Sequence, residues 1–355
     1  MERPSIPVWP VERVRGPASS FLLSTQERAW SKTADFARAM MVRSGFMADI
    51  PKRRVRAPAR AHLPLPVAAA LPRASASEGI VSASFRYLGE SAALPSELAR
   101  RLALGSSSAP GLAAPLICVE SPGTRLLTGF TLSEPNPELA QLEPGRPAGQ
   151  LSAGAGAALQ SIGAIVDPRS ATGDVSWRAG PTDEQASGLD NKGFVVLKQV
   201  LPPGLCSAIS QHYAALRESS RLETDPFSGR LVEKDEPFAL HLLRELTGFV
   251  SELARRPLVA TYCYSMWYLR GARLAMHTDN EQCEYSLSLN IDQSPRDAAP
   301  WPFCVVSRGG LRITELCTAT GDAVLFRGRA LPHYRRRLVQ GEAATGILLH
   351  YTEQL

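Results

Sequence analysis

The chain has 355 residues, which is too long for one small domain and predicts about two domains. Hydrophobic residues make up 44% of it, and no apolar run approaches the roughly 20 residues of a membrane-spanning helix, so we expect no membrane segment. The six cysteines form no C-x-x-C pair, which argues against a zinc cluster or a disulfide framework and predicts buried free thiols in a reducing compartment.

The formal net charge of +5 is concentrated in the N-terminal part of the chain. Residues 1–80 hold 13 Lys and Arg against 6 Asp and Glu, with the highest density between Lys52 and Arg60. This stretch could attract nucleic acid or another polyanion. The alternative is a solvated linker, which the bracketing prolines and the lack of interleaved aromatic residues favour. Residues 1–5 lack the charged-then-apolar layout of a signal peptide, so we expect a cytoplasmic protein.

The first 187 residues give few signals of regular structure. One amphipathic helix is expected over residues 24–45, because a serine can cap its start and apolar residues recur at helical spacing. Residues 57–190 are rich in Ala, Pro, Ser and Gly, with short apolar islands at 116–119 and 126–130. We interpret residues 1–187 as an irregular accessory region of unknown role, either a loosely ordered domain or a partly disordered arm.

A strand and two helices are predicted directly after the accessory region. Residues 193–200 are rich in β-branched side chains and precede two prolines, as a strand would. Apolar residues recur every four or so positions in 205–216 and again in 236–256, so both segments are expected to be helices that pack outside the main sheet. His212 and His241 fall on these helices, and we predict structural roles for both.

Turn-bounded strands are predicted in close succession from residue 258 onward. The clearest is 283–291, where apolar and polar residues alternate as in a strand with one buried face. This density of short strands is typical of the double-sheet jelly roll that cupins share. The predicted fold is therefore α+β, a double-stranded β-helix (jelly-roll) barrel with packing helices in a domain of residues 188–355. The predicted strands are 259–269, 273–277, 283–291, 302–307, 311–316, 323–327 and 344–352.

His277, Asp279 and His333 are the candidate metal ligands. The pattern H-x-D with a distant His supplies two imidazoles and one carboxylate, which can occupy one face of an octahedral Fe(II) and leave the opposite face open. The two histidines are 56 positions apart, which predicts that the ligands come from non-adjacent strands of a barrel with inward-pointing side chains. The alternative is that both histidines are merely polar residues of the barrel interior.

The same region carries a wider set of motifs. In chain order they are Tyr268-x-x-Gly271-x(5)-His277-x-Asp279, then Gly321 to Phe326, then His333 and Gly341. With these motifs, residues 190–353 resemble the Fe(II)/2-oxoglutarate-dependent dioxygenases, most closely their prolyl-4-hydroxylase-like branch. The resemblance implies that the three candidate ligands are catalytic and hold Fe(II), with 2-oxoglutarate as co-substrate and O₂ as oxidant.

The resemblance also bears on the reaction. Halogenase-type relatives replace the carboxylate ligand by a small residue, so Asp279 implies hydroxylation or desaturation. In this branch a tyrosine can hydrogen-bond the co-substrate, and Tyr268 is the better match, with Tyr264 as the other candidate. Either tyrosine could instead be a core aromatic residue of a buried strand.

One departure concerns the cation that pairs with the distal carboxylate of 2-oxoglutarate. The branch usually places Lys or Arg two residues after the glycine matched by Gly341, where this chain has Ala343. An unpaired carboxylate in an apolar interior is costly, so we expect the charge to come from elsewhere. Arg335 shares strand parity with His333 and is the first candidate; Arg335 to Arg337 could also be a solvated basic edge. The further candidates are Arg337, Arg308 and Arg312.

The predicted protein is an enzyme, a hydroxylase that oxidises a C–H bond of an amino acid, a peptide residue or a small metabolite. The reaction would be coupled to oxidative decarboxylation of 2-oxoglutarate to succinate. We expect a small-molecule or peptide substrate as partner, without nucleic acid or membrane. Two alternatives stay open: a dioxygenase that dealkylates nucleic acid with the help of the basic stretch, and a cupin-like metal-binding module without turnover, which Ala343 motivates.

Overall fold

The computed structural model describes most of the chain from residue 62 onward. The predicted helix at 24–45, the basic stretch at 52–60, Arg308 and Gly341 lie outside the described residues. The described ranges are 62–64, 79–89, 95–102, 115–121, 123–149, 151–166, 181–218, 222–225, 228–295, 300–307, 312–339 and 343–354.

The largest sheet has seven strands in the order β7-β15-β12-β17-β10-β9-β8, and neighbouring strands in it run antiparallel. Two of its three long strands, β10 and β12, coincide with segments in which the sequence alternates between apolar and polar residues or is rich in aromatic and β-branched ones. The strands are β7 (Phe194–Leu197), β8 (Glu223–Thr224), β9 (Arg230–Lys234), β10 (Leu258–Leu269), β12 (Tyr285–Ser294), β15 (Ala323–Phe326) and β17 (Ala343–Glu353).

A second, four-stranded sheet has the order β11-β16-β13-β14. Its strands are β11 (Leu274–His277), β13 (Phe303–Val306), β14 (Ile313–Leu316) and β16 (His333–Arg335). Phe303 and Val305 of this sheet pack with Val324 and Phe326 of the seven-stranded sheet in one buried cluster, so the two sheets face each other. The predicted mixture of helices and antiparallel strands is confirmed. The strands β8, β9 and β16 were not predicted.

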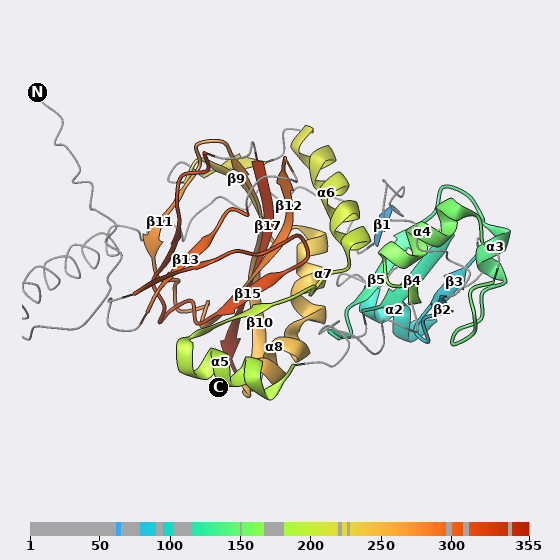
Figure 1. Ribbon diagram of the computed structural model, residues 1–355, viewed down its shortest axis with the longest axis horizontal. Coiled ribbons are helices and arrows are strands. Elements are labelled where there is room, and N and C mark those ends of the chain that lie inside the picture. The colour runs from blue at the N-terminus through green and yellow to red at the C-terminus, as the bar shows by residue number, and fades with distance from the viewer. Residues whose placement is uncertain are drawn as a thin grey trace, which may run out of the picture. The chain divides into compact units, whose positions relative to one another are not determined.

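Helices cover the other face of the seven-stranded sheet (Figure 1). They are α5 (Asp183–Lys192), α6 (Pro203–Glu218), α7 (Pro237–Glu245) and α8 (Thr247–Ala254). The prediction of one helix over 236–256 is wrong, because the chain turns at Leu246 between α7 and α8. None of the helices in the described part of the chain combines the length and apolar character needed to cross a bilayer.

The two faces of the seven-stranded sheet differ in character. Cys263 and Trp267 of β10 belong to the apolar cluster shared with the helices. Tyr264, Met266 and Tyr268, at the intervening positions, form a separate cluster on the face turned toward the second sheet. Because successive side chains of a strand point to opposite faces, the sequence alternation places the aromatic and polar groups of β10 in the space between the sheets.

The six cysteines are free thiols. The prediction of burial is confirmed for five of them and is wrong for Cys317, which is exposed. Burial raises the pKa of Cys118 and of Cys283 to about 12, so these thiols are poor nucleophiles near neutral pH.

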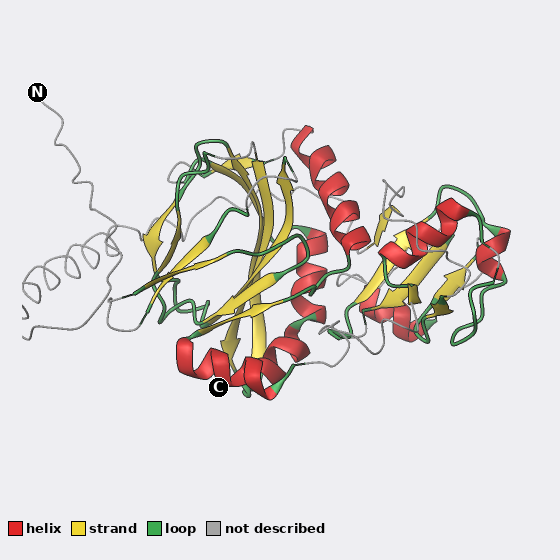
Figure 2. Cartoon of the chain, viewed as in Figure 1, coloured by secondary structure: helices red, strands yellow, loops and turns green. Residues whose placement is uncertain are grey.

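Residues 62–166 contain more regular structure than their composition indicates, and the prediction of an irregular region is wrong there. Figure 2 shows strands flanked by helices in this part of the chain. A four-stranded sheet has the order β1-β5-β4-β3, in which β1 and β5 are parallel, and β2 pairs with β6. The elements are β1 (His62–Pro64), β2 (Ile80–Val81), β3 (Arg86–Leu88), α2 (Ser96–Leu102), β4 (Leu116–Glu120), β5 (Leu127–Thr131), α3 (Pro137–Ala140), α4 (Ala153–Ser161) and β6 (Ile165–Val166).

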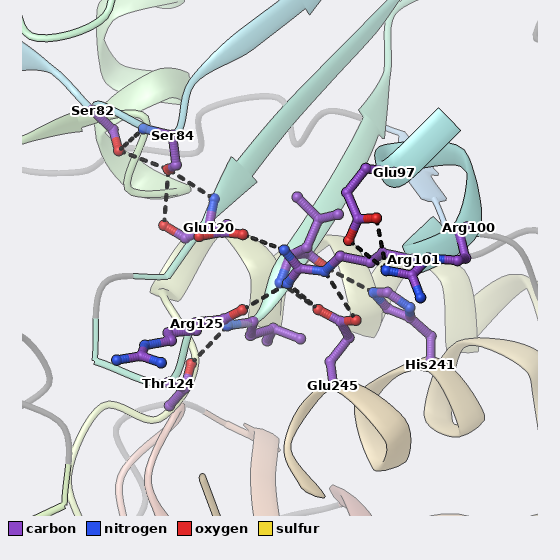
Figure 3. Close-up of polar contacts among 12 residues, drawn as sticks. Ser82, Ser84, Glu97, Arg100, Arg101, Glu120, Thr124, Arg125, His241 and Glu245 are labelled. Atoms are coloured by element: carbon purple, nitrogen blue, oxygen red, sulfur yellow. Dashed lines mark hydrogen bonds and ion pairs between the residues drawn. The ribbon is translucent and has the colours of Figure 1, made fainter. Parts of the chain in front are cut away.

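The sheet β1-β5-β4-β3, named the accessory sheet, is joined to α7 by a network of polar contacts centred on Arg101 (Figure 3). The guanidinium of Arg101 pairs with Glu120 of β4 and, at 2.5 Å, with Oε2 of Glu245 at the end of α7. The same Glu245 oxygen accepts the backbone N–H of Leu127 at 3.0 Å. His241 Nε2 lies 2.7 Å from the Leu127 carbonyl, which confirms the structural role predicted for His241. Burial alone would lower the pKa of Arg101, but the hydrogen bonds to Glu245 and Glu120 outweigh it and raise the pKa.

Replacing Glu245 by Ala is expected to lower the free energy of unfolding by about 2–4 kcal/mol, because Arg101 and the Leu127 N–H both lose an acceptor in a partly buried site. Glu97→Ala is the matched control, since it removes an ion pair to Arg100 between two exposed side chains of α2 and should change stability by less than about 0.5 kcal/mol. Denaturant unfolding of the full chain, followed by circular dichroism, measures both variants. Equal effects would show that the Glu245 contacts do not fasten the accessory sheet.

Candidate metal centre

His277 and His333 face each other across two hydrogen-bonded strands. His277 is the last residue of β11, His333 is the first residue of β16, and the two are direct partners in the antiparallel register. Directly opposed residues project their side chains to the same face of a sheet, and the two imidazole centroids lie 4.3 Å apart. The prediction of non-adjacent strands is therefore wrong, because sequence separation does not limit which strands pair.

Asp279 completes the group from the segment that follows β11. Its backbone N–H donates to the Gly328 carbonyl at 2.9 Å, which ties this segment to the turn after β15. Asp279 Oδ1 lies 3.5 Å from Nε2 of His277 and 3.5 Å from Nε2 of His333. One ligand atom from each of the three residues thus lies within 4.8 Å of the others.

The tautomers of both histidines follow from their backbone contacts. His277 Nδ1 lies 2.9 Å from the Ala275 carbonyl, and His333 Nδ1 lies 2.9 Å from the Leu331 carbonyl. A carbonyl oxygen only accepts, so each Nδ1 carries the proton and donates it. Each Nε2 faces Asp279. When protonated, it donates a hydrogen bond to that carboxylate; when deprotonated, it offers its lone pair to a metal ion, as metal-ligating histidines do.

The site is buried on one side and accessible on the other. The side chains of His333 and Asp279 are 2% and 8% exposed, whereas that of His277 is 37% exposed. Burial alone would raise the pKa of Asp279, but hydrogen bonds from His277 and His333 outweigh it and hold that pKa well below its usual range. The carboxylate is therefore ionised at neutral pH and offers a negative charge to a cation.

These residues fit a divalent transition metal. Ligand bonds of about 2.1 Å at right angles would place neighbouring ligand atoms about 3 Å apart, so the observed separations of 3.5 Å need little closure. Two neutral imidazoles and one carboxylate on one side of a metal are the ligand set typical of non-haem Fe(II) oxygenases. His277, Asp279 and His333 would hold the ion.

Arg335 lies between the sheets, on the same face of β16 as His333. Its guanidinium is 5.3 Å from the ring centroid of Phe303, and that ring is 5.4 Å from the imidazole of His333. Nη1 donates to the Trp301 carbonyl at 3.0 Å. Among the described residues no carboxylate pairs with Arg335, and burial lowers the pKa of this guanidinium. Arg335 is thus a cation near the three candidate ligands, and no described carboxylate compensates its charge.

Tyr268 is buried beside a second arginine that sequence reasoning missed. The Tyr268 hydroxyl accepts a hydrogen bond from Arg230 Nη1 at 2.8 Å, and Arg230 Nε donates to Asp225 at 3.1 Å. Burial alone would lower the pKa of Arg230, but Tyr268 and Asp225 outweigh it and raise the pKa. Arg230 therefore already has an anionic partner, in contrast to Arg335. No sequence motif marks Arg230, because it lies in strand β9, which was not predicted.

The other residues considered for the co-substrate differ in their placement. Arg337 and Arg312 are exposed. Tyr264 is buried and packs edge-on against Tyr262 and His350. Ala343 pairs with Leu269, whereas Ala344 pairs with Tyr268 and shares its cluster between the sheets. A basic side chain at position 343 would therefore point away from that space.

Ser286 and His350 form a second group of residues that sequence reasoning missed. Ser286 of β12 donates its hydroxyl to Asp279 Oδ2 at 2.7 Å, and His350 Nδ1 of β17 lies 2.9 Å from the same hydroxyl. The two are direct partners in the β12–β17 ladder. Burial lowers the pKa of His350 to about 4, so its imidazole is neutral near pH 7. The strand parity of 283–291 could have placed Ser286 on the inner face, but no motif marks His350.

No protein-family model and no curated protein matches this chain. Solved structures that resemble it include a prolyl-4-hydroxylase from Pseudomonas putida, at 14% identity over 48% of this chain and 98% of that chain, with a TM-score of 0.42. Another is HygX from Streptomyces hygroscopicus with nickel and 2-oxoglutarate bound, at 20% identity over 50% of this chain and 89% of that chain, with a TM-score of 0.38. A third is a prolyl hydroxylase from Trichoplax adhaerens in complex with a peptide fragment, at 15% identity over 47% and 87% of the two chains, with a TM-score of 0.41. Prolyl hydroxylases, expected from the sequence motifs, are thus among the structures that this chain resembles.

Proposed function

We propose that this chain is an Fe(II)/2-oxoglutarate-dependent dioxygenase that hydroxylates or desaturates a C–H bond of an amino acid, a peptide residue or a small metabolite. The observation that carries the proposal is the convergence of two histidine Nε2 atoms and one ionised carboxylate oxygen, with an accessible side at His277. When bound there, Fe(II) supplies activation of O₂ coupled to oxidative decarboxylation of 2-oxoglutarate to succinate.

The side chains around the ligands have separate tasks in this proposal. Arg335 binds the distal carboxylate of 2-oxoglutarate, because a dianion in this enclosed space needs a cation and no carboxylate in the described part of the chain pairs with this guanidinium. Phe303 packs between Arg335 and His333 and excludes water from the path between cation and ligands. The Tyr268 hydroxyl accepts from Arg230 and donates at 3.7 Å to the Met266 sulfur, a weak acceptor, so its proton can be redirected to the co-substrate.

The fold supports the same proposal. Two antiparallel sheets that face each other, with helices on the outer face of the larger one, are what a double-stranded β-helix (jelly roll) requires. We propose that residues 188–355 form the catalytic domain and residues 1–187 an accessory region. The Arg101 contacts tie part of that accessory region to α7, on the side of the large sheet opposite the metal ligands.

One experiment separates an active dioxygenase from a metal-binding module without turnover. Fe(II) and 2-oxoglutarate, added together without O₂, are expected to give a weak charge-transfer absorption band that neither gives alone. Admission of O₂ should then release succinate slowly even without the primary substrate. A protein that binds Fe(II) but shows neither the band nor succinate would be the binding module, and one that binds no Fe(II) would overturn the proposal.

A further inference from the structure

The carboxylate of Asp279 is held at both of its oxygens by different partners. Oδ1 is the oxygen that faces both histidine Nε2 atoms, at 3.5 Å each. Oδ2 accepts the hydroxyl proton of Ser286 at 2.7 Å. A hydrogen bond at the second oxygen fixes the orientation of the carboxylate and favours Oδ1 as the oxygen offered to a metal ion.

The direction of the hydrogen bonds in this group is fixed by chemistry. An ionised carboxylate only accepts, so the Ser286 hydroxyl must donate to Asp279 Oδ2. The same hydroxyl can then only accept from His350, whose Nδ1 lies 2.9 Å away and must carry a proton. The hydrogen bonds are therefore donated from His350 to Ser286 and from Ser286 to Asp279. Both supporting residues are buried, with His350 2% and Ser286 0% exposed.

Gly328 makes room for this arrangement. A Cβ atom added at this position would lie 2.2 Å from Asp279 Oδ2 and 2.7 Å from Ser286 Oγ, which is too close for any side chain. The Gly328 carbonyl meanwhile accepts the Asp279 N–H at 2.9 Å. The backbone of Gly328 thus contacts Asp279 on the side of the hydrogen bond from Ser286, and only a glycine allows that approach.

We propose that Ser286, supported by His350, is a positioning residue that keeps Asp279 a ligand through one oxygen. The proposal rests on the proposed function. A carboxylate that binds through both oxygens would take a further coordination position. The three ligands His277, Asp279 and His333 must leave three positions for a chelating co-substrate and O₂. Hydrogen bonds that orient a ligating carboxylate also raise metal affinity, because they fix it before the ion arrives.

The same three residue types form hydrolytic triads in other proteins, but their arrangement here excludes that role. In such a triad the histidine accepts the serine proton and the aspartate contacts the histidine. Here the serine lies between the other two and donates its proton to the aspartate. Ser286 is also completely buried, so no substrate carbonyl can reach its hydroxyl.

Titration of the full chain with Co(II), which fills such sites and has a visible spectrum, tests the proposal. Ser286→Ala is expected to weaken Co(II) binding by about 10–100-fold, as loss of an outer hydrogen bond to a ligand typically does. It should also change the d–d bands, because the freed carboxylate can rotate and bind through both oxygens. Ser288→Ala is the matched control, since Ser288 lies on the same face of the same strand without contacting Asp279.

A pair of variants at His350 keeps the test decisive if Ser286→Ala does not fold. His350→Asn can place an N–H where the imidazole has Nδ1, whereas the similarly sized His350→Leu cannot. The proposal expects the Asn variant to retain most of the affinity and the wild-type spectrum, and the Leu variant to lose both. If Ser286→Ala kept the wild-type Co(II) affinity and d–d bands, or if the two His350 variants behaved alike, this inference would be overturned while the proposed function would stand. Failure of the wild-type chain to bind Co(II) would overturn the proposed function together with it.

Discussion

Replacing Asp279 by Ala is expected to abolish Fe(II) binding at micromolar metal. Loss of an outer partner of a metal ligand typically costs about 10–100-fold in affinity, and loss of the ligand itself should cost more than about 100-fold. Asp279 supplies the only negative charge of the group and lies equally far from both histidines, so no other described side chain can take its place without moving β11 or β16. Succinate release from 2-oxoglutarate should fall below detection in the same variant.

Two further variants distinguish loss of the ligand from general damage. Asp279→Asn keeps the shape but not the charge, and it should bind Fe(II) more weakly than wild type by at least about tenfold, because a neutral amide oxygen is a poorer ligand than a carboxylate. Glu281→Gln removes a charge two residues further along, from an exposed side chain, and should leave affinity unchanged. Anaerobic equilibrium dialysis with Fe(II) measures all three, and the melting temperature of each apo form shows whether it is folded. Tight Fe(II) binding by a folded Asp279→Ala protein would rule out the proposed centre.

Residue patterns were sufficient to predict most strands of the two facing sheets. Long strands such as β10 and β12 were recognisable because one face packs on helices and the other does not, so the alternation of residue types records the burial. Short strands such as β8 and β16 contain too few residues to show a period. The break between α7 and α8 was missed because Leu246 continues the apolar stripe while the backbone turns there.

The accessory sheet was missed for a different reason. Its strands β4 and β5 are almost wholly buried, so they read as short apolar islands without alternation. Such runs do not distinguish strand from helix, and the Ala- and Gly-rich segments around them gave no turn signal that could. Contacts such as Arg101 with Glu245 join residues 144 positions apart, and nothing local in the sequence marks them.

In the candidate site, the motif residues were predicted from the sequence and the residues that support them were not. An H-x-D motif with a distant histidine can be recognised in the sequence because the proposed Fe(II) would require those residue types. The residues that support the motif, such as Ser286, His350 and Arg230, are ordinary residues whose role comes from the register of β12 with β17 and of β9 with β10. Their partners are therefore visible only once the strands are paired.

Replacing Arg335 by Ala is expected to weaken 2-oxoglutarate binding by roughly 30-fold or more, since truncating one partner of an enclosed, hydrogen-bonded charge pair costs at least about 2 kcal/mol. Arg335 has no carboxylate partner within the described part of the chain, so its charge is free to pair with the co-substrate. Arg335→Lys keeps the charge but loses the planar two-pronged donor, and it should fall between Ala and wild type. The dissociation constant follows from anaerobic titration of the Fe(II)-loaded protein with 2-oxoglutarate.

Two controls make the Arg335 result specific. Arg337→Ala removes an exposed arginine two positions further along the same segment, and it should leave the dissociation constant unchanged. Fe(II) affinity in the absence of 2-oxoglutarate should also stay at the wild-type value in Arg335→Ala, because no contact joins this guanidinium to the three ligands in the described structure. An unchanged dissociation constant in Arg335→Ala would remove this residue from the site and direct attention to Arg230, whose present partner Asp225 would then have to give way to the co-substrate.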